Sequence, residues 1–73
     1  MVTDKIVVNP KILTGHPIVK GTRIPVSLIL NLFAHGYTVS KIIDEYPELT
    51  AADVKAAAFY AEERIKREEV YPA

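Results

Sequence analysis

Side chains able to act as nucleophiles, acids or bases are few in this sequence, and they form no recognisable catalytic motif. His16 and His35 lie far apart along the chain and lack the H-x-x-x-H or Glu-flanked spacing of a metal site. Neither histidine forms a motif with Ser27 or Ser40. Cysteine is absent, so there is no thiol nucleophile and no Cys-based metal site. We therefore expect no enzyme, no cofactor and no bound metal.

Charge is balanced overall but unevenly distributed along the chain. Nine basic and nine acidic residues give a net charge of zero. Residues 1–41 carry five basic residues against one acid, whereas residues 42–73 carry eight acids against four basic residues. The basic front half could contact phosphate, or it could face the acidic half of a second copy. A net charge of zero argues against strong non-specific binding of nucleic acid.

Nothing in the sequence directs the chain to a membrane. Residues 1–5 lack the basic and apolar regions of a signal peptide, and the longest apolar runs are far short of the ~20 residues that span a bilayer. We expect a single cytoplasmic domain over residues 1–73. A chain of this length buries only about 60% of its unfolded surface, and oligomerisation is a common way to extend so small a core.

The stretch 15–26 connects the basic front of the chain to everything that follows. It contains two glycines and two prolines among β-branched residues. Gly21 can adopt positive φ and close a tight turn, and Pro25 keeps Ile24 out of a helix. We expect a strand, a sharp bend, a short strand and then a helix that begins near Val26.

Besides the short strand after the bend, local signals along the chain predict two strands and three helices. The β-favouring runs are Lys5–Val8 and Ile18–Lys20. The first helix is Val26–His35, ended by Gly36, and the second is Val39–Tyr46, capped by Thr38. The third runs from Ala51 to about Arg67, with Thr50 as its cap and Asp53 in its first turn. A loose tail is expected over 70–73. A turn over 47–49 joins the last two helices, as in helix-turn-helix proteins. The predicted fold is α+β, mainly α, with a short N-terminal β-ribbon followed by a three-helix, helix-turn-helix-like bundle.

Arg23 has two competing roles. Its guanidinium could hold the ribbon on the helices through a bidentate clamp to one of three acids, with Thr22 hydrogen-bonding locally within the turn. The candidate acids are Asp44, Glu45 and Glu48. Alternatively, Arg23 contacts phosphate. The clamp is the preferred interpretation.

A helix-turn-helix protein reads base edges with the first turns of its second helix. Here those turns offer one lysine, one acid and no Arg, Asn or Gln, which are the usual base readers. If DNA is bound, contact with its phosphates is therefore a better expectation than base reading, but an ordinary solvated surface is the preferred interpretation of these cations. The candidate nucleic-acid contacts are Lys20, Thr22, Arg23, Lys41, Thr50 and Lys55.

Two of the predicted helices offer more apolar surface than one small core uses. The helix over 26–35 is apolar on nearly all sides, so it is either the centre of the fold or part of an interface. The small alanines of the helix over 51–67 would let another helix approach closely. Self-association is the firmest functional expectation from the residues alone. The candidate oligomer or partner contacts are Leu28, Leu32, Phe33, Ala58, Ala61 and Ile65.

The segment P-I-V-K-G-T-R-I-P-V over 17–26, Gly36, and the segment Y-P-E-L-T over 46–50 together resemble the small prokaryotic family DUF433, a domain of unknown function. The resemblance covers roughly residues 6–61, with a mild departure at His16, where the family commonly has Gly or Arg. Members are often encoded beside a PIN-like nuclease and are regarded as antitoxin-like, with a helix-turn-helix-related fold. The resemblance implies a protein that binds a PIN-like toxin partner and also binds promoter DNA. The alternative is an oligomeric protein-interaction module without DNA binding.

Overall fold

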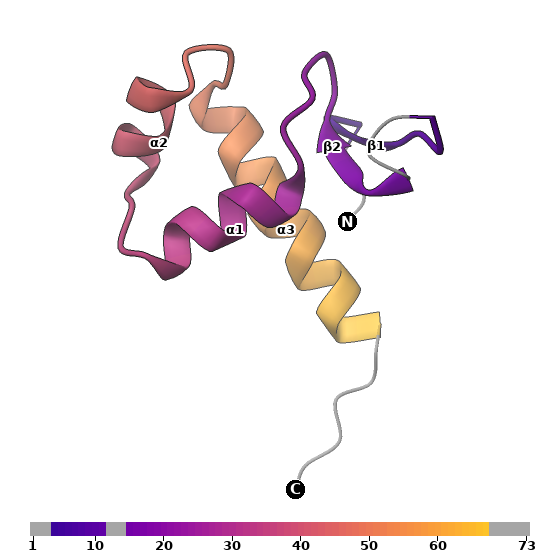
Figure 1. Ribbon diagram of the computed structural model, residues 1–73. Helices are drawn as coiled ribbons and strands as arrows, with labels where there is room; N and C mark the ends of the chain where they lie inside the picture. The colour runs from indigo at the N-terminus through magenta and orange to yellow at the C-terminus, as the bar shows by residue number, and fades with distance from the viewer. Residues whose placement is uncertain (1–3, 12–14, 68–73) are drawn as a thin grey trace, which may run out of the picture.

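Two short strands and three helices form the part of the chain that the structure, a computed structural model, describes, namely residues 4–11 and 15–67. In chain order they are β1 (Ile6–Val8), β2 (Pro17–Val19), α1 (Val26–Ala34), α2 (Val39–Glu45) and α3 (Ala51–Arg67), as Figure 1 shows. The predicted fold, a β-ribbon followed by three helices and mainly α, is confirmed. The tail predicted over 70–73 lies outside the described residues.

The ribbon is antiparallel, and its inner side is buried. Ile6 lies opposite Val19 and Val8 opposite Pro17, and the amide of Lys20 extends the pairing by donating to the Lys5 carbonyl at 2.7 Å. A two-stranded ribbon is marginal in water by itself. Here β2 contacts α1 and β1 contacts α3, so the helices supply the apolar support that the ribbon lacks.

Local chemistry sets the ends of α1. Pro25, with φ −77°, precedes the first helical residue, in keeping with the prediction that Ile24 stays outside the helix. Gly36 then adopts φ +88°. Its amide donates to the Phe33 carbonyl at 3.0 Å, and the Tyr37 amide donates to the Leu32 carbonyl at 3.0 Å. These two bonds form a Schellman motif, which satisfies carbonyls that the helix end would otherwise leave unpaired.

The core lies where α1 crosses α3 beneath the ribbon (Figure 1). Its largest fully buried side chains come from β2, α1, α2 and α3: Ile18, Val19, Ile29, Ile42 and Val54. Of the two roles predicted for α1, the structure places this helix at the centre of the fold. Three half-buried side chains of the same helix also pack against this core: Leu28, Leu32 and Phe33.

The third helix projects beyond the elements that it packs against. In Figure 1 its C-terminal half extends past α1 and the ribbon. Val54 and Ala57 in the first half are fully buried, whereas Ile65 in the second half is 56% exposed. The helix therefore presents side chains that the rest of the described chain does not cover.

Candidate functional site

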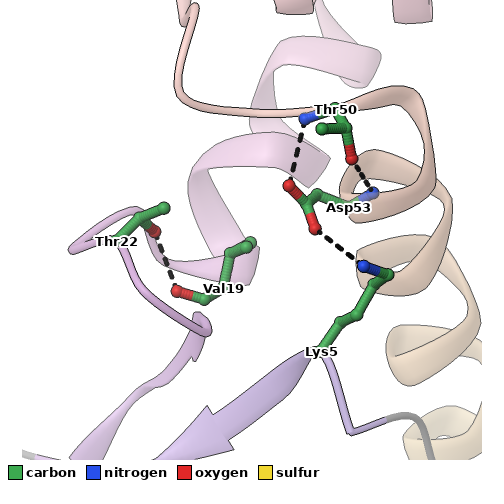
Figure 2. A network of polar contacts seen from close by, with 5 residues as sticks. All are labelled: Lys5, Val19, Thr22, Thr50 and Asp53. Carbon is green, nitrogen blue, oxygen red and sulfur yellow. Dashed lines mark hydrogen bonds and ion pairs between the residues drawn. The ribbon is translucent and has the colours of Figure 1, made fainter.

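The bend after β2 is closed by a threonine. Gly21 adopts φ +83°, and the Thr22 hydroxyl donates to the Val19 carbonyl at 2.8 Å (Figure 2). The Thr22 amide donates to the same carbonyl at 3.0 Å. The Ile24 amide in turn donates to the Thr22 hydroxyl oxygen at 3.0 Å. The local hydrogen bonding predicted for Thr22 is confirmed, and its hydroxyl is occupied on both sides by the backbone of its own turn.

The clamp predicted for Arg23 is not formed. Arg23 is exposed, and among the residues that the structure describes it makes no ion pair with Asp44, Glu45 or Glu48. These three acids are exposed on or just after α2, where Glu45 accepts a long hydrogen bond of 3.4 Å from the Tyr37 hydroxyl. The Thr22 turn fixes the backbone without a contact from Arg23. The side chains of Arg23 and Lys20 are both exposed to solvent.

A different ion pair joins the ribbon to the helices. The Lys5 ammonium lies 3.6 Å from the Asp53 carboxylate, whose side chain is only 15% exposed (Figure 2). Asp53 also accepts from the Thr50 amide at 3.0 Å, and its own amide donates to the Thr50 hydroxyl oxygen at 3.1 Å. This reciprocal pair has the logic of a capping box, with Asp in place of the usual Glu. The predicted cap by Thr50 is confirmed, whereas the role of Asp53 as an anchor for Lys5 was missed.

The predicted nucleic-acid contacts do not all come together. Lys20 lines a small hollow of about 270 Å³ with Asp4, Lys5 and Asp53 beside the start of α3, and Thr50 belongs to the same network through Asp53. Lys41 is instead on α2, with its ammonium 4.6 Å from the centre of the Tyr37 ring. Contact with nucleic acid by any of these residues stays a prediction.

The predicted oligomer or partner contacts separate into two groups. Leu28, Leu32 and Phe33 pack against the core of their own chain, which accounts for their apolar character without a partner. The other three lie along α3, where Ala58 is exposed, Ala61 is half-buried and Ile65 is 56% exposed. Their role in association remains a prediction, and only the α3 group presents substantial uncovered surface.

A groove of about 530 Å³ runs along another face of α3, and sequence reasoning missed it. It is lined by Lys5, Ala52, Lys55, Ala56, Phe59, Glu62 and Glu63. Phe59 is 59% exposed in this groove. The spacing of Ala52, Ala56, Phe59 and Glu63, at four, three and four residues, places them on one helical face and was a usable signal.

Within the described residues, no three His, Cys, Asp or Glu side chains gather closely enough to hold a metal ion. No helix in residues 4–11 and 15–67 has the length and hydropathy of a membrane span.

Comparisons with known proteins find similarity in sequence and in fold. The chain is similar to a DUF433 member protein from Anabaena variabilis ATCC 29413, whose crystal structure matches with a TM-score of 0.78 and 34% identity over 93% of this chain and 70% of that one. It is also 39% identical over 54 residues to the uncharacterized protein y4eO of Sinorhizobium fredii (strain NBRC 101917 / NGR234). That match covers 74% of this chain and 24% of the relative, so the chain spans about a quarter of y4eO.

The family model described as "Protein of unknown function (DUF433)" matches residues 6–61. The matched segment runs from the first residue of β1 through the Thr22 turn and both helix caps into the middle of α3. The chain belongs to the DUF433 family.

Proposed function

We propose that this protein is an antitoxin-like binding protein, not an enzyme, that acts in the cytoplasm and holds a PIN-like toxin as its partner. The observation that carries the proposal is the apolar stripe Ala58, Ala61 and Ile65, which runs from the middle of α3 into the part that projects beyond the body. We call these three residues the α3 stripe.

The α3 stripe has the form of a helix that lies in a groove of another protein. Its residues are spaced i, i+3 and i+7, the pattern by which a helix places anchors on one face. Ile65 is 56% exposed, and Ala58, about two turns earlier on the same face, is also exposed. Covering this face would remove apolar surface from water without disturbing the core, because Val54 and Ala57 are already buried in the preceding turns.

The choice of partner rests on the family. DUF433 members are often encoded beside PIN-like nucleases, which makes the product of the neighbouring reading frame the first partner to test. The alternative remains an interaction module that joins other proteins and has no toxin or DNA role.

The test is co-purification of the chain with the product of the neighbouring reading frame, followed by titration of the purified pair. Ile65→Lys is expected to weaken the complex more than tenfold, because burying an isoleucine stabilises an interface by about 1.5–3 kcal/mol. Val8→Lys is the matched control, since Val8 is equally exposed (55%) and lies on β1. If Ile65→Lys bound the toxin candidate as tightly as the unaltered chain, the α3 stripe would not be the binding surface. If no complex formed at all, the proposal of a toxin partner would be wrong.

Promoter DNA is a second candidate, favoured by one observation. Three lysines surround the first turns of α3: Lys5 and Lys20 line the small hollow beside Asp53, and Lys55 shares the neighbouring groove with Lys5. With Arg23 exposed on the adjacent turn, they offer cations for phosphates, which position a protein on DNA without reading its sequence.

Two substitutions distinguish a DNA-contact role from a structural role in this turn: Arg23→Ala and Thr22→Val. Arg23→Ala is expected to lower the affinity for DNA in a salt-dependent gel shift on the upstream region. Its Tm should be unchanged, because Arg23 makes no ion pair within the described residues.

Thr22→Val is expected to cost about 1–3 kcal/mol of stability, since it removes the hydroxyl that hydrogen-bonds to the Val19 carbonyl and the Ile24 amide. Thr22→Ser retains the hydroxyl and should restore the Tm. No shift by the unaltered chain at low salt would remove DNA from the proposal.

A further inference from the structure

We draw no further inference here: the strongest candidate, the groove of about 530 Å³ along α3 beside the exposed Phe59, carries rim charges that pair within the chain, Lys5 with Asp53 and Glu62 with Lys66, and nothing in the described residues shows what covers it.

Discussion

Replacing Ile29 by alanine is expected to lower the free energy of unfolding by about 2–5 kcal/mol. Ile29 is fully buried in α1, at the centre of the cluster that joins the ribbon to the helices. Removing its side chain loses apolar burial and leaves a cavity that the surrounding turns fill only in part. A domain of this size has a total stability of roughly 5–10 kcal/mol, so the variant should melt at least about 10 °C lower.

Leu30 provides the control for this prediction. It follows Ile29 on the same helix but is 37% exposed, so Leu30→Ala deletes a side chain of equal size that the core does not fully enclose. The expected cost is less than half that of Ile29→Ala in urea unfolding. Equal losses for the two variants would contradict the placement of α1 in the core.

Ala57→Leu should destabilise the chain by about 1–3 kcal/mol through overpacking. Ala57 is fully buried in α3, in the same cluster as Ile29, and α1 packs against this helix. A larger side chain there has no space unless the helices separate. The comparison is with Ala58→Leu, because Ala58 is the next residue along the helix and is exposed; its effect should stay within about 0.5 kcal/mol.

Thermal and urea unfolding of both variants, followed by circular dichroism, would measure the difference. A buried-to-exposed contrast between adjacent alanines is a strict test of helix rotation. If Ala58→Leu proved the more damaging of the two, α3 would have to be turned by about a third of a turn relative to the structure.

The elements could be predicted because their signals are local. Gly36, Thr38 and Thr50 act on backbone groups within a few residues of themselves, so their roles follow from residue type and spacing. The same is true of Thr22, whose two partners lie within three residues. These predictions required no knowledge of how the helices pack.

The link between ribbon and helices could not be predicted in the same way. Lys5 and Asp53 are far apart in sequence and meet only because β1 docks beside the start of α3. Sequence reasoning chose Arg23 and the acids near α2 instead, since a forked guanidinium is the better clamp by residue type. Distance in the folded chain decided the pair, and no local pattern carries that information.

The apolar residues of α3 from Val54 to Ile65 recur at the spacing of one helical face. The periodicity was correct, since Val54 and Ala57 are buried and Ala61 continues on the same side. What periodicity does not reveal is where the neighbouring elements end. Because α3 extends past them, Ile65 continues the periodicity but is left 56% exposed. The groove face with Phe59 was missed because its charged rim hid it among solvated residues.

The length of α3 has a consequence for how the chain opens. Its first turns share buried contacts with the other elements, whereas the turns near Ile65 can lose their hydrogen bonds without exposing the core. We therefore expect the C-terminal half of α3 to open with a lower free energy than the N-terminal half. A protein that covers the projecting half would slow amide hydrogen exchange there and leave the rate in the core almost unchanged. The exchange rates of the backbone amides near Ile65 would therefore measure how much of this surface is bound by a partner.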